Sequence, residues 1–220
     1  MLDKSFNGRK VILTAGPTYE PIDPVRFIGN HSTGKMGFAL AECFARHGAE
    51  VHLVAGPTNL KAQDPAIEVT HVTTADEMYE AVRRLAPAAD IWVFAAAVAD
   101  YKPKAASAKK IKKAGDELTI ELVKNVDIAA ALGKEKRTDQ FSVGFALETD
   151  NETVNAREKL QKKNLDMIVL NSLNDPGAGF KHDTNKITII EQEATTAFEL
   201  KSKTEVAQDI VNLIWERVHA

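Results

Sequence analysis

The segment RFIGNHSTGKMG, residues 26–37, says more about the fold and the ligand of this chain than any other stretch. It places Gly29, Gly34 and Lys35 at the G-x-x-x-x-G-K spacing of a phosphate-binding P-loop. The residue that follows should be a Ser or Thr whose hydroxyl holds magnesium, but it is Met36. A true P-loop is therefore not expected, and a P-loop kinase is disfavoured.

The residues before this segment also differ from a P-loop. Pro21 and Pro24 interrupt the chain there, so no strand is expected to lead directly into Gly29. What remains is a polar, glycine-punctuated loop that opens a helix. Backbone N–H groups at the start of a helix face bound anions, and the helix dipole favours negative charge there. The sequence therefore predicts a phosphorylated ligand at this loop.

Outward from this loop, short apolar strands alternate with amphipathic helices. Strands are expected at residues 11–14, 50–54, 67–72, 91–95, 141–145 and 167–170, and helices at 35–46, 74–85, 152–163 and 203–218. The strand at 91–95 is so apolar that it should lie centrally, and a pair at 186–190 and 196–200 should form an antiparallel edge. The pattern predicts one α/β domain over residues 1–220, a Rossmann-like, doubly wound, mostly parallel sheet with a protruding flap at about 101–122.

Composition restricts the class of protein and its partners. The chain has 220 residues and a net charge of −3, so no overall positive charge attracts nucleic acid. No apolar run approaches the roughly 20 residues that span a bilayer, so no membrane partner is expected. Cys43 is the sole cysteine, and its apolar neighbours favour a packed core thiol over a nucleophile. We expect a cytoplasmic protein.

Small residues follow three of the expected strands. They lie in TAGPT (14–18), in AAAVADY (95–101) and in GFALET (144–149). In an open α/β sheet, ligands bind beyond the carboxyl ends of the strands, and small residues let a ligand approach the backbone. Tight packing of helices on the sheet would explain any one of these segments equally well. Three together, with the loop at Asn30, favour a binding site.

The flap carries six lysines: Lys102, Lys104, Lys109, Lys110, Lys112 and Lys113. Three interpretations remain open, namely a solvated loop, a weakly supported nucleic-acid contact, and a mobile arm that brings ammonium groups to a polyphosphate. The alternating residues 110–113 and 117–122 predict a hairpin. Its apolar face needs a partner, for which a second copy of the chain is the expectation.

Other polar residues near the loop have competing roles. His31 is either a structural hydrogen-bonding residue or a general base, with the structural role favoured. Asp23 and Glu20 form a possible carboxylate pair, but an ion pair of Asp23 with Arg26 that braces the loop is favoured. No His, Cys or Glu spacing predicts a metal site built by protein side chains alone. The expected metal is Mg²⁺ carried by a nucleotide.

Taken together and in order, six motifs resemble the phosphopantothenoylcysteine synthetase family. They are TAGPT (14–18), EPIDPVR (20–26), NHSTGKMG (30–37), AAVADY (96–101), KIKK (110–113) and VGFALET (143–149). The resemblance extends from about Lys10 to the final helix. An ordered set with compatible spacing is far more specific than any single loop.

This resemblance implies a two-step ligation in coenzyme A synthesis. The carboxylate of 4′-phosphopantothenate attacks the α-phosphate of CTP and releases pyrophosphate. The amine of L-cysteine then attacks the acyl-cytidylate and releases CMP. Preference for CTP rather than ATP is inherited from the family and does not follow from the residue chemistry. In many bacteria the activity is half of a bifunctional chain, so phosphopantothenoylcysteine decarboxylase is an expected partner.

The resemblance also implies roles for individual residues. Asn30, Ala96 and Ala97 would hold the phosphopantothenoyl part. The nucleotide would contact Gly16, Ser32, Gly34, Asp100, Lys110, Phe145, Lys159 and Lys163, with Val126, Asp127, Ile128 and Ala129 near the cytidine. Asn30 and Lys110 would be catalytic, because an amide can hold the acyl carbonyl and an ammonium can offset charge at phosphorus.

Two other classes of function remain as alternatives. A nicotinamide-dependent reductase needs G-x-G-x-x-G after the first strand and an acidic residue at the end of the second. The chain has AGPT (15–18) and VAG (54–56) at these places, so neither requirement is met. A non-catalytic binding module built on the lysine-rich flap is the other class, and it predicts no nucleotide turnover.

Overall fold

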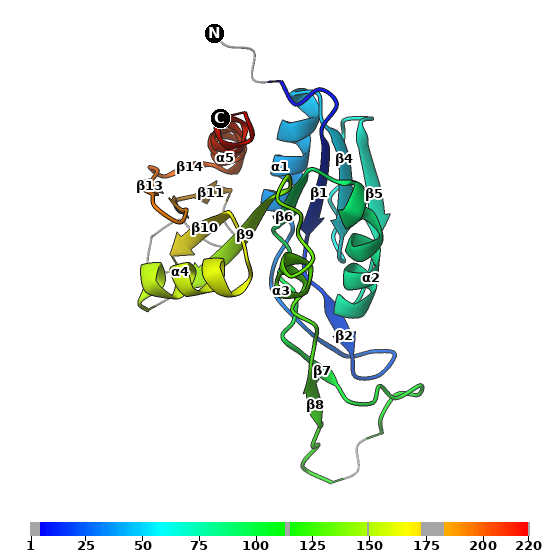
Figure 1. The fold of residues 1–220 in the computed structure, drawn as a ribbon. Helices are drawn as coiled ribbons and strands as arrows, with labels where there is room; N and C mark the ends of the chain where they lie inside the picture. Colours follow the sequence, from blue (N-terminus) through cyan, green and yellow to red (C-terminus); the bar gives the residue numbers. More distant parts are fainter. Residues whose placement is uncertain (1–4, 113–114, 149, 173–182, 220) are drawn as a thin grey trace.

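A computed structural model describes residues 5–112, 115–148, 150–172 and 183–219. Within them, an eight-stranded sheet has the order β13-β12-β10-β9-β6-β1-β4-β5 (Figure 1). The parallel strands are β1 (Lys10–Ala15), β4 (Glu50–Ala55), β5 (Ile67–His71), β6 (Ile91–Phe94), β9 (Phe141–Glu148) and β10 (Met167–Ser172). The antiparallel strands β12 (Ile187–Ile190) and β13 (Thr195–Ala197) form one edge. The predicted mostly parallel sheet, its central strand β6 and its antiparallel edge are confirmed.

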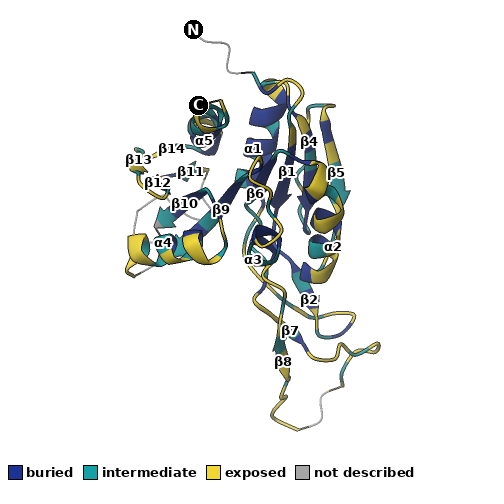
Figure 2. Ribbon diagram, viewed as in Figure 1, coloured by how far each residue is buried: buried dark blue, intermediate teal, exposed yellow. Residues whose placement is uncertain are grey.

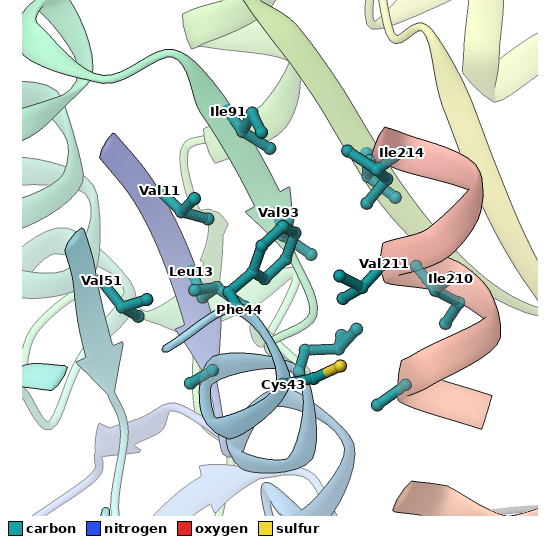
Figure 3. Close-up of a cluster of buried hydrophobic side chains, with 14 of the residues drawn as sticks. Val11, Leu13, Cys43, Phe44, Val51, Ile91, Val93, Ile210, Val211 and Ile214 are labelled. Atoms are coloured by element: carbon teal, nitrogen blue, oxygen red, sulfur yellow. The ribbon is translucent and has the colours of Figure 1, made fainter. Parts of the chain in front are cut away.

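Helices cover both faces of the sheet, as a doubly wound fold requires. They are α1 (Lys35–Arg46), α2 (Ala75–Leu85), η1 (Ala86–Ala88), α3 (Ile128–Gly133), α4 (Glu152–Lys162) and α5 (Lys203–Val218). Helices α1 and α5 pack on one face, where Phe44 and Ile214 meet Val11 and Val93 of the strands (Figure 3). Helices α2, α3 and α4 pack on the other face. The central strands β1 and β6 are mostly buried, whereas the edge strands β5 and β13 are largely exposed or half-buried (Figure 2).

Local sequence explains where helix α2 begins and why Cys43 is inert. Thr74 and Glu77 form a capping box at the start of α2. Cys43 lies in the core under α5 and is fully buried, as expected for a packed thiol. Burial raises the pKa of the Cys43 thiol to about 11, so the thiolate is not available near neutral pH. No helix among the described residues has the length and apolarity that crossing a membrane requires.

The expectation that no strand leads into Gly29 is wrong. Strand β2 (Tyr19–Pro21) pairs antiparallel with β3 (Phe27–Gly29), and the ring of Tyr19 stacks on that of Phe27 with centroids 3.8 Å apart. The prolines do not break this ribbon, because Pro21 ends a strand and Pro24 lies in the turn between the strands. The ribbon lies outside the main sheet, which still separates this loop from a P-loop.

The flap is a hairpin, but its strands lie at its root. Strand β7 (Tyr101–Pro103) pairs with β8 (Leu122–Lys124), whereas the predicted pairing of residues 110–113 with 117–122 is absent from the described part of the flap. Lys113, which belongs to the predicted hairpin, lies outside the described residues, and so does Thr149 of the motif at 143–149. The flap extends beyond the end of the sheet beside β2 and is mostly exposed (Figures 1 and 2).

One carboxylate fixes the flap to the β2–β3 turn. Asp23 is 3% exposed and accepts hydrogen bonds from the backbone N–H of Val25 (2.9 Å) and Ile111 (3.1 Å) and from Arg26 Nε (3.1 Å). Arg26 Nη2 donates in turn to the carbonyl oxygen of Ile111 at 3.1 Å. The predicted brace between Asp23 and Arg26 is confirmed, and it also holds both backbone polar groups of Ile111. The hydrogen bond from Arg26 is the main reason why the pKa of Asp23 lies well below its usual range.

We predict that Asp23→Ala loosens the flap. The change leaves the N–H of Ile111 without its acceptor, so hydrogen exchange at Ile111 should become about 5- to 10-fold faster, the effect of roughly one hydrogen bond. Because the pKa of Asp23 is lowered in the folded state, the brace is present at neutral pH and should be lost only on strong acidification. Exchange measured by mass spectrometry on flap peptides tests this.

The control for this prediction is Lys104→Ala. Lys104 forms an exposed ion pair with Glu121 within the flap, at 2.7 Å, and exposed pairs contribute little. Exchange at Ile111 should therefore stay unchanged in this variant. Unchanged exchange in Asp23→Ala as well would mean that other contacts hold the flap in place.

Candidate active site

Two adjoining cavities open where β1, β6 and β9 end. The first, called here the α3 cavity, has a volume of about 570 Å³ and lies beside α3 and α4. The second, the α1 cavity, has a volume of about 360 Å³ and lies at the start of α1. Ala96, Val98, Asp100 and Phe145 line both cavities, so a ligand can extend from one into the other. Their position at the carboxyl ends of parallel strands is the one predicted for a ligand site.

The structure brings most of the predicted site residues to these cavities. The α3 cavity is lined by Ala96, Asp100, Val126, Asp127, Ile128, Ala129, Phe145, Lys159 and Lys163, and the α1 cavity by Asn30, Ser32, Gly34, Ala96, Ala97, Asp100 and Phe145. The residues expected around a cytidine therefore gather in one cavity, and those expected around an acyl group and phosphates gather mainly in the other.

Hydrogen bonds between loops shape the wall that the cavities share. The N–H groups of Ala96 and Ala97 donate to Thr14 Oγ1 (3.2 Å) and to the carbonyl oxygen of Gly16 (2.9 Å). Asn30 Nδ2 donates to the carbonyl oxygen of Ala97 at 3.0 Å. The small side chains after β6 thus leave room for a ligand, while their backbone is held to the loop after β1 and to Asn30.

Gly34 shows why the loop before α1 needs glycine. Its φ is +83°, a left-handed conformation, and a Cβ there would lie 3.2 Å from the backbone nitrogen of Gly16. Gly16 has a φ of +78° and lines neither cavity. Its place is beneath Gly34, where it supports the loop through backbone contacts. The close approach of the two glycines presents the N-terminus of α1 to the α1 cavity.

Three further residues singled out in the sequence are not brought to the cavities. Lys110 is exposed on the flap and lines neither of them, and neither does His31, which is exposed in the loop before α1. Glu20 is buried away from the cavities, where its Oε1 accepts the N–H of Ala75 at the start of α2, at 2.9 Å. Glu20 therefore has a structural role at a helix N-terminus rather than one in a carboxylate pair.

The α3 cavity carries an excess of positive charge. Lys124, Lys159, Lys162 and Lys163 line it, against the carboxylates of Asp100 and Asp127. Lys159 is paired with Glu148, and Lys163 Nζ lies 3.0 Å from Asp127 Oδ2. Asp127 also accepts the N–H of Ala130 and so begins α3. Such a surface favours a polyanionic ligand.

Sequence reasoning missed several residues that line the cavities. Lys124, Asn125 and Lys162 line the α3 cavity, and Lys35, Asn171, Asn185 and Lys203 line the α1 cavity. Lys203 is 8% exposed at the first position of α5, and burial, assisted by Lys35, lowers its pKa. A cation at a helix N-terminus opposes the helix dipole, which was the available signal. No sequence signal marked Asn171 and Asn185, because only the fold brings these two residues together.

Among the described residues, no three His, Cys, Asp or Glu side chains gather as a metal site. Asp100 is exposed and lines both cavities, so its carboxylate is accessible to a metal ion that a nucleotide would carry. One carboxylate with phosphate oxygens and water is a usual coordination for Mg²⁺.

Over most of its length, the chain is similar in sequence to parts of several longer proteins. It is 46% identical over 214 residues to the coenzyme A biosynthesis bifunctional protein CoaBC of Haemophilus influenzae, covering 97% of this chain and 53% of that protein. It is 43% identical over 210 residues to CoaBC of Escherichia coli K12, covering 94% and 52%. A protein named cysteine/cysteine sulfinic acid decarboxylase, from an unknown prokaryotic organism, is 55% identical over 218 residues, covering 99% and 61%. The chain thus spans about half to three fifths of the curated relatives it matches.

Solved structures agree with these sequences. A crystal structure of the C-terminal domain of CoaBC superposes with a TM-score of 0.83 at 38% identity, covering 99% of this chain and 98% of that one. A Cab2 mutant in complex with phosphopantothenate-cysteine shares the fold, with a TM-score of 0.76 at 17% identity, covering 96% and 87%. The family model described as DNA/pantothenate metabolism flavoprotein C-terminal domain matches residues 6–218. The chain therefore belongs to this family, which confirms the resemblance seen in its motifs.

Proposed function

We propose that this chain is a phosphopantothenate–cysteine ligase of coenzyme A biosynthesis that uses CTP. The observation that carries the proposal is the pair of adjoining cavities that share Ala96, Asp100 and Phe145. An acyl-cytidylate has a nucleotide part and an acyl part, and each cavity gathers the residues expected for one of them. The CoaBC relatives and the CoaBC C-terminal domain structure support the same activity.

In the proposed first step, an oxygen of the phosphopantothenate carboxylate bonds to the α-phosphorus of CTP, and the bond to pyrophosphate breaks. The lysines of the α3 cavity offset the charge of the nucleotide phosphates. Mg²⁺ bound with the nucleotide would supply further neutralisation of the phosphates near Asp100. The backbone of Ser32 and Gly34, at the start of α1, would face phosphate groups.

In the proposed second step, the amine of L-cysteine bonds to the acyl carbon, CMP leaves, and the nitrogen loses a proton. Negative charge develops on the acyl oxygen, and a neutral amide donor can stabilise it without adding charge. We assign this role to Asn30, which lies beside Ala97 in the α1 cavity. The residue is catalytic in this proposal because it contacts the reacting carbonyl.

Lys110 lines neither cavity of its own chain, so a catalytic role for it needs a second copy of the chain. We propose that the flap packs against a second copy of the chain. Exposed apolar side chains on the flap and on the adjacent β2–β3 ribbon support this: Val25, Phe27, Tyr101, Leu118 and Leu122. Burial of these side chains in a dimer would bring Lys110 to an assembled site.

The proposal predicts that pyrophosphate is released before any amine is added. The chain should be mixed with phosphopantothenate and each nucleoside triphosphate in turn, in a single-turnover assay with and without L-cysteine. CTP should give pyrophosphate without L-cysteine, and CMP only with it. If ATP is the one nucleoside triphosphate that gives pyrophosphate, the chain is an ATP-using version of the same ligase. If pyrophosphate is released only when L-cysteine is present, a separate cytidylate-forming step is excluded.

Asn30→Asp and Lys110→Gln should slow different steps. Asn30→Asp places a carboxylate beside the carbonyl of Ala97 and where charge develops, so the second step should lose about 3–4 kcal/mol of stabilisation. The acyl-cytidylate should then accumulate and be detectable by mass spectrometry. Lys110→Gln should weaken activation itself, so no intermediate should build up. The control Lys104→Gln should behave as the unmodified chain, and equal loss of both steps in both variants would contradict the assigned roles.

Dimer formation through the flap has its own test. Leu122→Asp places a charge on the exposed apolar surface of the flap, and sedimentation should show a shift from dimer to monomer. The control Val154→Asp alters a side chain of α4 that is 58% exposed and distant in the fold, so it should remain dimeric. A monomeric and fully active unmodified chain at micromolar concentration would contradict the dimer.

A further inference from the structure

The α1 cavity has a polar end to which the proposed chemistry gives no role. Four side chains line it there: Lys35 at the first position of α1, Asn171 on β10, Asn185 on β11 (Thr184–Asn185) and Lys203 at the first position of α5. Helices α1 and α5 pack side by side against the sheet (Figure 3), and their N-terminal lysines are close enough for Lys35 to lower the pKa of Lys203. The end of the cavity therefore combines two amides with two cations.

One of the two amides, that of Asn185, has an oxygen without a hydrogen-bond donor among the described residues. The residue is 2% exposed, and its Nδ2 donates to Asn171 Oδ1 at 2.9 Å. Its own Oδ1 is buried and has no hydrogen-bond partner within the described residues. Burying an acceptor without a donor is costly, and Asn185 lines the cavity, so a ligand that donates a hydrogen bond there would satisfy this atom. An amine is a donor of this kind.

The lysines point to a ligand that is also an anion. Lys203 is buried, and both lysines occupy helix N-termini, where the dipole already favours negative charge. Lys35 pairs with Asp183 at 2.5 Å, but the side chain of Asp183 is 85% exposed. A pair so open to solvent is weak, so a carboxylate entering the cavity can take its place beside Lys35.

We propose that this end of the α1 cavity binds the amino-acid substrate, with its carboxylate facing Lys203 and Lys35 and its amine donating to Asn185 Oδ1. The inference rests on the proposed function and assigns residues to its second substrate. The same cavity holds Asn30 and Ala97, where the acyl carbonyl is proposed to lie. A neutral amide acceptor suits a nucleophile, because it orients an N–H and leaves the nitrogen lone pair for the acyl carbon, whereas a carboxylate would favour the unreactive ammonium.

The competing assignment is that these lysines bind phosphates of the nucleotide. Comparing L-cysteine with cysteamine, which has the amine and thiol but no carboxylate, separates the two. Lys203→Gln should raise the KM for L-cysteine roughly 10- to 100-fold, the effect of losing one charge-assisted hydrogen bond, and leave the KM for cysteamine unchanged. Pyrophosphate release in the absence of amine should match that of the unmodified chain.

Two further variants and a control complete the test. Lys35→Gln, at a partly exposed helix start, should change selectivity in the same direction, and it decides the question if Lys203→Gln does not fold. Asn185→Leu should raise the KM for both amines, because both donate to the amide. Lys201→Gln is the matched control, because Lys201 is two residues from Lys203 but pairs with Asp209 at 2.6 Å outside the cavity.

Slower pyrophosphate release in the lysine variants, with selectivity for L-cysteine over cysteamine intact, would overturn the proposal and assign the lysines to the nucleotide phosphates. Equal KM values for Asn185→Leu and the unmodified chain would overturn the role of the amide. Absence of pyrophosphate release by the unmodified chain is a distinct outcome, which would remove the proposed ligase activity and this amino-acid site with it.

Discussion

The arrangement of the site depends on hydrogen bonds between the loops that follow β1 and β6. The N–H groups of Ala96, Ala97 and Ala99 donate to the end of β1 and to the loop that follows it, two of them to the buried hydroxyls of Thr14 and Thr18. Each pairing satisfies a backbone group that would otherwise be buried without a partner. The resulting wall is thin, because its side chains are small, and it separates the two cavities only in part. A ligand with a nucleotide part and an acyl part can therefore lie across it.

Much of this fold could be predicted from sequence, because its strands are short, apolar and separated by helices with clear ends. The capping box at Thr74 and the core position of Cys43 follow from local pattern alone. The β2–β3 ribbon was not predicted, because proline statistics argue against strands and the turn around Asp23 is stabilised by a side chain and by the flap. The flap ladder was misplaced for a related reason: backbone groups at Ile111 bind the ribbon instead of the facing strand.

The candidate site could also be predicted only in part. The small-residue segments at strand ends predicted the position of both cavities, because topology alone brings the carboxyl ends of parallel strands together. Residues such as Asn185 and Lys203 could not be predicted, since they reach the α1 cavity from β11, which lies outside the main sheet, and from a helix distant in sequence. Gly16 illustrates the opposite case. A resemblance to a ligand-binding motif marked it, but in this chain it lies against the backbone of Gly34 and Gly56, and its carbonyl oxygen accepts the N–H of Ala97.

The two cavities differ in how their charge is arranged, and this difference fits the order of the proposed steps. In the α3 cavity, lysines are paired with carboxylates, so a polyphosphate must displace or share exposed partners that cost little to replace. In the α1 cavity, Lys203 is buried, and Asn185 Oδ1 has no hydrogen-bond partner among the described residues, so hydrogen-bonding capacity is available before a ligand arrives. Preorganised groups of this kind pay their reorganisation cost on folding, not during the reaction. A small amino acid has few atoms with which to gain affinity, so it needs such a prepared site more than a nucleotide does.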